Sequence, residues 1–216
     1  VERELHTFCI TRYKVLSPKW NGEKSGKIIF LSDLHNHEYG LHNKKLIDKI
    51  KKENPELILI GGDILVGKED ISYESAAGFV EAICKIAPVY YANGNHEQRM
   101  KEKPEKYGNA FVGYKKRLLD AGVHFLENES AEVELGGNKL CLTGLELQLE
   151  VYEKMKTHKV TKEDVAQKVG PAKQEEIQIL LAHNPEYMEA YQAWGADITL
   201  SGHLHGGLIC LPNGKS

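Results

Sequence analysis

Seven side chains that can bind a metal ion stand where short apolar runs of this sequence end. They are Asp33, His35, Asp63, Asn95, His183, His203 and His205. Residues two apart in an extended segment point to the same side, so Asp33 pairs with His35 and His203 pairs with His205. The carboxyl ends of strands in an open α/β sheet border the crevice that binds ligands. The pattern therefore predicts one cluster of metal-binding side chains.

The cluster combines carboxylates, an amide oxygen and imidazoles, and it contains no thiolate. Such a set suits Mn, Fe, Zn or a mixture of these divalent ions. Seven ligands are too many for one tetrahedral zinc ion, so two divalent metal ions that share a bridging carboxylate are the simplest solution.

Each of these residues also has an ordinary structural explanation when it is taken alone. A histidine at a strand end is commonly a hydrogen-bonded structural residue, Asn95 can hold a turn, and Asp33 or Asp63 can cap a helix. The recurrence of the pattern at successive strand ends favours the metal site. His37 and His42 are expected to be loop residues, with ligand contact as the alternative, and His6, His124 and His158 lie outside any such motif.

Two βαβ units are expected to position the first of these side chains. Residues 27–32 and 57–60 read as buried strands, and Leu46, Ile47 and Ile50 mark the helix between them, so the strands should be parallel. The second unit has an apolar stripe at Val80, Ile83, Cys84 and Ala87, followed by a strand that leads to Asn95 and a helix marked by Phe111, Tyr114 and Leu118. Asp63 ends the central strand.

The antiparallel strands that follow are expected to form a second sheet packed on the first, and two further strands are expected after them. Residues 123–126, 131–135 and 139–142 read as antiparallel strands, with a turn at 136–138, and buried strands at 177–182 and 197–201 lead to His183 and His203. Residues 8–16 also read as a strand. Residues 146–176 are expected to form a surface excursion with one helix that Thr161 caps, while Asn184 is expected to cap a helix that begins with Pro185.

Composition limits the possible partners. The 216 residues are 41% hydrophobic and 27% charged, and the net charge is −3, so a nucleic-acid surface is disfavoured and a small or lipid-like phosphate compound is expected. Four dispersed cysteines suggest free thiols rather than a disulfide framework: Cys9, Cys84, Cys141 and Cys210. No apolar run is long enough to span a bilayer. A cytoplasmic location is favoured over membrane association or export of a longer protein.

The motifs resemble, in order and spacing, those of calcineurin-like metallophosphoesterases over nearly the whole chain. They are Asp33-x-His35, Gly62-Asp63, Gly94-Asn95-His96-Glu97, His183 and Gly202-His203-x-His205. The stretches around Asp33 and His183, with the double glycine after His205, are most similar to the bacterial YkuE/YaeI-like branch. That branch includes phosphohydrolases related to those that act on UDP-diacylglucosamine, which implies a lipid-linked nucleotide as one kind of substrate.

The resemblance implies an α/β fold, namely a four-layer α/β/β/α sandwich of two mixed β-sheets flanked by helices. Residues 1–216 would form a single metallophosphoesterase domain. Two departures stand out, because Leu208 replaces the glutamine that is usual in this branch and the chain ends at Ser216 before further expected strands. The C-terminal part of the domain is therefore expected to be truncated.

The resemblance also implies a role for each site residue. Asp33, His35, Asp63 and His205 would hold one metal ion, and Asp63, Asn95, His183 and His203 would hold the other, so that Asp63 is the bridge. His96 would be the catalytic residue that contacts the phosphate and protonates the leaving group, and Glu97 would orient His96 without binding metal.

These assignments predict a hydrolase that cleaves a phosphate ester or a diphosphate bond. Two divalent ions and two aspartates sum to a local charge of about +2, which attracts phosphate although the whole chain is slightly acidic. Metal ions roughly 3.5–4 Å apart can clamp phosphate oxygens and supply a bridging hydroxide for in-line attack. A non-catalytic protein-binding scaffold on the same fold and a nuclease are the alternatives.

Overall fold

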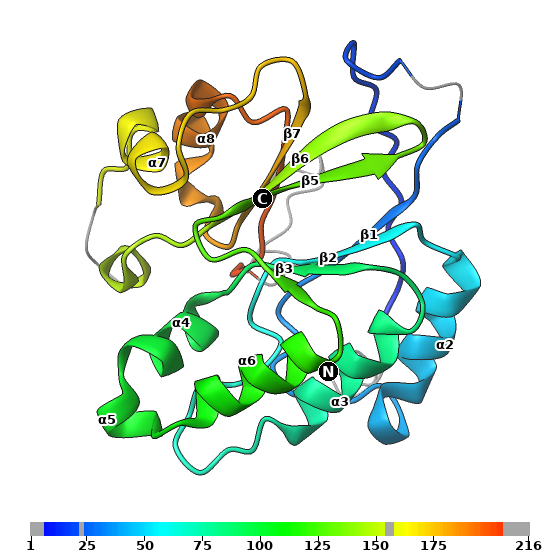
Figure 1. The fold of residues 1–216 in the computed structure, drawn as a ribbon. Helices are drawn as coiled ribbons and strands as arrows, with labels where there is room; N and C mark the ends of the chain where they lie inside the picture. The colour runs from blue at the N-terminus through cyan, green and yellow to red at the C-terminus, as the bar shows by residue number, and fades with distance from the viewer. Residues whose placement is uncertain (1–6, 22–23, 154–157, 205–216) are drawn as a thin grey trace, which may run out of the picture.

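The computed structural model describes residues 7–21, 24–153 and 158–204, and it contains two sheets packed face to face with helices on both outer sides (Figure 1). The first sheet has the strand order β1-β2-β3-β4 and the second has the order β5-β6-β7-β8. Three apolar clusters fill the three spaces between the four layers. The predicted α/β/β/α sandwich is confirmed.

The first sheet is parallel at every described strand pair, as the βαβ pattern predicts for its first three strands. Its strands are β1 (Ile28–Leu31), β2 (Leu57–Ile60), β3 (Val89–Tyr91) and β4 (His124–Phe125). Strand β2 is buried on both faces, because Ile58 and Ile60 pack under the helices while Leu57 and Leu59 pack between the sheets. This central strand leads to Asp63.

Strand β4 corrects one prediction. Residues 123–126 were expected in the antiparallel second sheet, but β4 pairs in parallel with β3 in the first sheet. The preceding helix α6 (Ala110–Asp120) carries the chain back along the sheet, and a crossover of this kind gives a parallel neighbour.

The outer face of the first sheet is covered by helices (Figure 1). They are α2 (Lys44–Glu53), which follows the 3₁₀ turn η1 (Leu41–Asn43), α3 (Glu74–Cys84), α4 (Asn95–Glu102), α5 (Pro104–Tyr107) and α6. The predicted helical stripes are confirmed, except that Ala87 lies beyond the end of α3. Asn54 ends α2 in a left-handed conformation, which asparagine adopts more readily than most other residues.

The second sheet contains the expected hairpin and two parallel strands. Strands β5 (Ser130–Leu135) and β6 (Asn138–Leu145) are antiparallel, and Gly136 and Gly137 join them with positive φ angles of 57° and 81°. A two-residue turn with both φ angles positive is the type that glycines permit. Strands β7 (Ile177–Ala182) and β8 (Ile198–Leu200) then add in parallel.

The fourth layer includes part of the stretch that was expected to be a surface excursion. Thr161 caps helix α7 (Lys162–Val169) as predicted, because its side chain accepts the Asp164 backbone N–H. Val165 of α7 is fully buried in the third apolar cluster, beside helix α8 (Met188–Trp194). Asn184 caps the short η3 (Pro185–Tyr187) that leads into α8, also as predicted. Helix α7 is therefore part of the core.

The expected strand at residues 8–16 is wrong. The described residues of this segment form no strand, and Tyr13 and Leu16 expose 85% and 82% of their surface. Arg12 holds the segment through an ion pair of 2.6 Å with Glu53 of α2. The composition favours a strand, but a strand also needs a neighbour that pairs with its backbone. No described helix is long and apolar enough to cross a membrane.

Candidate metal centre

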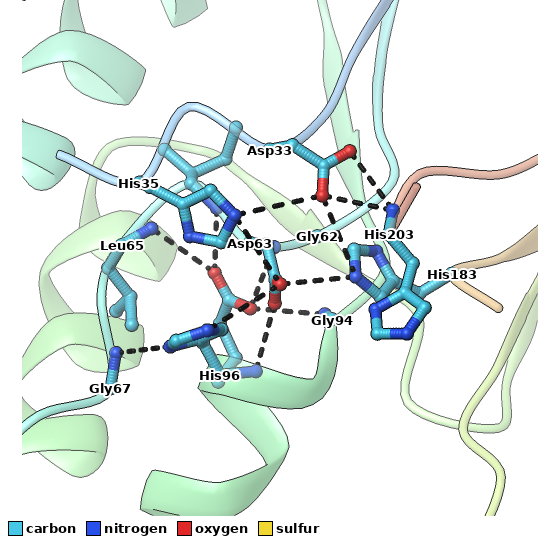
Figure 2. A network of polar contacts seen from close by, with 12 residues as sticks. Asp33, His35, Gly62, Asp63, Leu65, Gly67, Gly94, His96, His183 and His203 are labelled. Atoms are coloured by element: carbon cyan, nitrogen blue, oxygen red, sulfur yellow. Dashed lines mark hydrogen bonds and ion pairs between the residues drawn. The ribbon is translucent and has the colours of Figure 1, made fainter. Parts of the chain in front are cut away.

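The carboxyl ends of five strands from both sheets converge on one place (Figure 2). The residues that follow these strands are Asp33 and His35 after β1, Asp63 after β2, Asn95 and His96 after β3, His183 after β7, and His203 after β8. The sequence predicts this convergence. The remaining expected ligand, His205, lies outside the described residues.

Two loops in this place are held by backbone pairing and adopt unusual conformations. The N–H of Asp33 donates to Gly62 O at 3.1 Å, and the N–H of His35 donates to Asp63 O at 3.0 Å. Asp33, His35 and Asp63 have φ angles of 56°, 48° and 54°, which are uncommon for residues other than glycine. Each residue in the left-handed conformation lowers the free energy of unfolding by roughly 1–2 kcal/mol, so the orientation of these side chains is obtained at the expense of stability.

Two glycines allow the loops after β2 and β3 to touch. Gly62 has a φ of +91°, and a Cβ atom there would lie 2.1 Å from the backbone N of Gly94. A Cβ atom on Gly94 would lie 2.2 Å from Asp63 Oδ1. Any larger residue at either position would push Asp63 out of place.

We expect Gly62→Ala to lower the free energy of unfolding by about 3 kcal/mol, because it combines a backbone clash with a strained φ angle. Urea denaturation measures this loss. Gly78→Ala in α3 is the matched control, since nothing lies within 4 Å of the added methyl group. The control should gain up to about 1 kcal/mol from helix propensity. Equal stability of the two variants would contradict the close approach.

Asp63 is the centre of the cluster and is only 2% exposed. Its Oδ1 accepts the backbone N–H of His96 at 2.9 Å. Its Oδ2 lies 3.2 Å from His183 Nε2, 3.8 Å from His35 Nε2 and 4.0 Å from His96 Nε2. Asp33 Oδ1 lies 3.8 Å from both His183 Nε2 and His35 Nε2. One buried carboxylate thus faces three imidazole rings.

The described ligand atoms form two groups whose members all lie within 4.8 Å of one another. One group is Asp33, Asp63 and His183, and the other is His35, Asp63 and His96. Asp63 belongs to both groups.

Two buried ligand atoms at the site would be better satisfied by a metal ion than they are by the protein's own groups. Asn95 Oδ1 is buried and has no hydrogen-bond partner among the described residues, and the buried His183 Nε2 has only the aspartates beside it, with Asp63 Oδ2 at 3.2 Å. His183 Nδ1 lies 2.7 Å from Gly61 O, so the ring proton on Nδ1 leaves the Nε2 lone pair directed at the aspartates. The donor set therefore fits a divalent cation.

The pKa shifts at the site show that a positive charge beside Asp33 and Asp63 is favourable. Burial lowers the pKa of His183, but the hydrogen bond and charge of Asp63, with the charge of Asp33, outweigh burial and raise the pKa to about 9. Burial raises the pKa of Asp63, but His183 and His96 outweigh it and hold the pKa well below its usual range. In the metal-free protein a proton on His183 supplies part of the charge that a cation would bring.

His96 sits at the start of α4 with its ring beside the ring of His35. Its Nδ1 accepts the backbone N–H of Gly67 at 2.9 Å, so the proton of the neutral ring lies on Nε2 and faces the cluster. Burial lowers the pKa of His96 to about 4, although the charge of Asp63 acts in the opposite direction. The ring is therefore a neutral hydrogen-bond donor in this structure.

Glu97 differs from its expected role, because its hydrogen bonds do not orient the His96 ring. The fully buried carboxylate accepts the backbone N–H groups of Asp63 and Gly94 at Oε2, and those of Ile64 and Leu65 at Oε1. The Tyr91 hydroxyl donates to Oε1 at 2.8 Å. Glu97 therefore fixes the loop that carries Asp63.

The second sheet delivers His203 to the same place. Its backbone N–H donates to both oxygens of Asp33, at 3.0 and 3.1 Å, and its ring lies 5.5 Å from the ring of His183. His37 packs against Tyr39, and His42 is exposed in the turn before α2, as expected for loop residues.

Tyr152 is a site residue that sequence reasoning missed. It lies in the 3₁₀ turn η2 (Leu149–Tyr152), and its ring is 5.1 Å from the ring of His203 and 6.1 Å from that of His183. No motif marks it. The one available signal is that it is the only Phe, Tyr or Trp between residues 146 and 176.

Comparison with known proteins identifies the class. The family model for calcineurin-like phosphoesterases matches residues 26–207, and the chain belongs to this family. Its members are metal-dependent phosphoesterases, which agrees with the two groups of candidate ligands.

Three relatives are similar over most of this chain. The chain is 26% identical to the uncharacterized protein YpbG of Bacillus subtilis over 94% of its length, which covers 68% of that protein. It is 26% identical to the phosphodiesterase YaeI of Escherichia coli and 28% identical to the uncharacterized metallophosphoesterase YkoQ of Bacillus subtilis. It spans 63% and 64% of these two proteins, with 86% and 88% of its own length matched.

A solved structure supports the fold. The phosphopantetheinyl hydrolase of Mycobacterium tuberculosis matches with a TM-score of 0.52 and 12% identity, over 83% of each chain. At this identity the likeness concerns the fold alone.

Proposed function

We propose that the protein is a dinuclear metal-dependent phosphoesterase that hydrolyses a phosphate ester or diphosphate bond. The observation that carries this proposal is the buried carboxylate of Asp63, which belongs to both groups of ligand atoms. The buried Asn95 Oδ1, which has no hydrogen-bond partner among the described residues and belongs to neither group, gives independent support. The YaeI relative is named a phosphodiesterase, so a phosphodiester is the first bond to test.

The proposed ligand sets follow the family resemblance. Asp33, His35, Asp63 and His205 would hold one ion, and Asp63, Asn95, His183 and His203 the other, with Mn, Fe and Zn as the candidate metals. When bound, two divalent ions clamp phosphate oxygens and make hydroxide available near neutral pH. The chain's own part is to direct these side chains through the strained loops, with carboxylates that follow strands of the first sheet and imidazoles that follow strands of both sheets.

His96 is proposed to contact the substrate phosphate. Its Nε2 carries the proton of the neutral ring and can donate a hydrogen bond to a phosphate oxygen or to the ester oxygen. His96 is also expected to protonate the leaving group. For this the ring must carry a proton on Nδ1 as well as on Nε2, so the hydrogen bond that Nδ1 accepts from the Gly67 N–H must first break. The hydrogen-bond role needs no such change.

The test is metal content together with hydrolysis of bis(p-nitrophenyl) phosphate. We expect two ions per chain after reconstitution and metal-dependent release of nitrophenol. His183→Asn should lose about 100-fold or more in turnover. Loss of a group that hydrogen-bonds to a metal ligand already costs about 10–100-fold in activity, and loss of the ligand itself should cost at least as much. His124→Asn is the matched control, since this exposed histidine stacks on Tyr90 outside the site.

Less than one ion per chain together with no hydrolysis above background would favour the alternative, a protein-binding scaffold on the same fold. A nuclease remains the weaker alternative because the chain carries a net charge of −3.

A further inference from the structure

A polar cavity of about 400 Å³ lies between α4, the turn η2 and α7. Its walls include Gln98 and Glu102 from α4, Gln148, Leu149 and Glu150 around the start of η2, and Lys168 from α7. In Figure 1 the yellow-green turn that contains η2 lies between α7 above and α4 below. None of its described lining residues is a candidate metal ligand.

Helix α4 carries residues of both the metal centre and the cavity. Asn95, Gln98 and Glu102 stand at positions i, i+3 and i+7, so they share one face of the helix. With a rise of about 1.5 Å per residue, Gln98 lies about 5 Å and Glu102 about 10 Å along the axis from Asn95. These distances match the reach of a small group attached to a phosphate at the metal centre.

The turn η2 makes the same connection from the opposite wall. Side chains at i and i+3 of a 3₁₀ helix lie above one another, so Leu149 and Tyr152 share a side. Leu149 lines the cavity, while the Tyr152 ring lies 5.1 Å from the ring of His203. Two separate elements thus carry a cavity residue and a site residue on one face.

The chemistry of the walls favours a hydroxyl-rich group. The Gln98 amide N–H groups already donate to Glu102 and to Leu147 O, but Gln148 offers an amide donor and acceptor, the carboxylate of Glu150 accepts, and Lys168 donates. Leu149 is the one apolar side chain among the described lining residues. An acyl chain would bury these polar groups without partners, which is costly.

The charge of the walls disfavours a second phosphate. Glu146 also lines the cavity, but Lys101 neutralises it through contacts of 2.8 and 2.6 Å with its two oxygens. Glu102 and Glu150 then face the single positive charge of Lys168. The excess of carboxylates repels an anionic group.

We propose that this cavity, the alcohol pocket, binds the alcohol group of the substrate, and that this group is an uncharged polyol such as glycerol or a sugar. The proposal rests on the proposed phosphoesterase function and deepens it. It places the substrate among phosphate esters of polar alcohols rather than among nucleotides that carry an acyl chain.

The test uses three diesters that share the p-nitrophenyl leaving group and differ only in the second alcohol: methyl, glyceryl and octyl. For metal-reconstituted protein we expect kcat/KM for the glyceryl diester to exceed that for the methyl and octyl diesters by about 10-fold, as two additional hydrogen bonds would give. The double variant Gln148→Ala/Glu150→Ala should bring the glyceryl-to-methyl ratio close to one. Both side chains are exposed, so the fold should tolerate the change.

Glu163→Ala on α7 is the matched control, because its side chain is 71% exposed and does not line the cavity. It should leave all three rates unchanged. Equal rates for the three diesters, or a preference for the octyl diester, would overturn the alcohol pocket and leave the phosphoesterase function standing.

A binding measurement covers the case in which no diester is cleaved. Saturation-transfer NMR with glyceryl methyl phosphate and octyl methyl phosphate should show selective binding of the glyceryl compound, which Gln148→Ala/Glu150→Ala abolishes. Selective binding without cleavage would contradict only the catalytic part of the proposed function. Absence of selectivity would overturn the pocket.

Discussion

Asp63→Asn will reduce the metal content from two ions per chain to less than one. The substitution keeps the volume of the side chain and the oxygen that can accept the His96 N–H, so it removes mainly the charge of the one carboxylate that belongs to both ligand groups. The loss of metal affinity should exceed the roughly 10–100-fold that follows removal of a group supporting a ligand. Turnover of a phosphodiester should fall with it.

Plasma emission analysis and calorimetric metal titration measure this effect. Asp48→Asn on α2 is the matched control, because the Asp48 side chain is 52% exposed and pairs only with Lys44 among the contacts described. Asn95→Ala provides a second comparison, since it should weaken mainly one of the two ions. Asp63→Asn protein that retains two ions per chain would refute the bridging role.

Glu97→Gln will destabilise the metal-free protein by about 3 kcal/mol, because one carboxylate oxygen that accepts N–H groups becomes an amide that donates. Glu97 accepts five hydrogen bonds in a fully buried position, and four of them come from the backbone of the loops after β2 and β3. Loss of these contacts should also lower the metal affinity about 10–100-fold, because the Asp63 loop is no longer fixed.

Urea denaturation measures the stability, and Glu102→Gln is the matched control on the same helix. Glu102 is exposed, so its substitution should change stability by less than about 0.5 kcal/mol. Equal unfolding midpoints for the two variants would contradict the role given to Glu97.

The pH dependence supplies an independent readout for Glu97. Burial and the charge of Asp63 raise the pKa of Glu97 from 4.5 to about 7. A raised pKa means that the folded protein holds the proton more tightly than the unfolded chain, so this contribution to stability is full below pH 4.5 and is lost as the pH rises through about 7. Glu97→Gln cannot titrate, so the stability difference between wild type and variant should shrink over this range.

The positions of the site residues were predictable because each follows a strand whose pattern is strong. Strand β2 is a run of four apolar residues, and a glycine pair ends it just before Asp63. A buried parallel strand has few other interpretations. The alternation of parallel strands and helices then brings the strand ends together whatever the details of the loops.

The failures also have physical reasons. Strand β4 has only two residues, so its short pattern could not assign it to a sheet. Glu97 and Asp63 are in contact although 34 positions separate them in the sequence, and Tyr152 and His203 are still farther apart along the chain. Contacts of this kind depend on how loops cross in space, which side-chain periodicity does not encode.

The ligand candidates come from both sheets, since Asp33, His35 and Asp63 follow strands of the first sheet and His183 and His203 follow strands of the second. Bound ions would therefore join the two halves of the sandwich, and metal binding and folding become one linked equilibrium. An ion present at 100 times its Kd adds about 2.7 kcal/mol to the stability of the folded state. By the same linkage, a substitution that loosens the packing between the sheets weakens metal binding from a distance, so metal starvation in a cell would act on this chain as a destabilising mutation does.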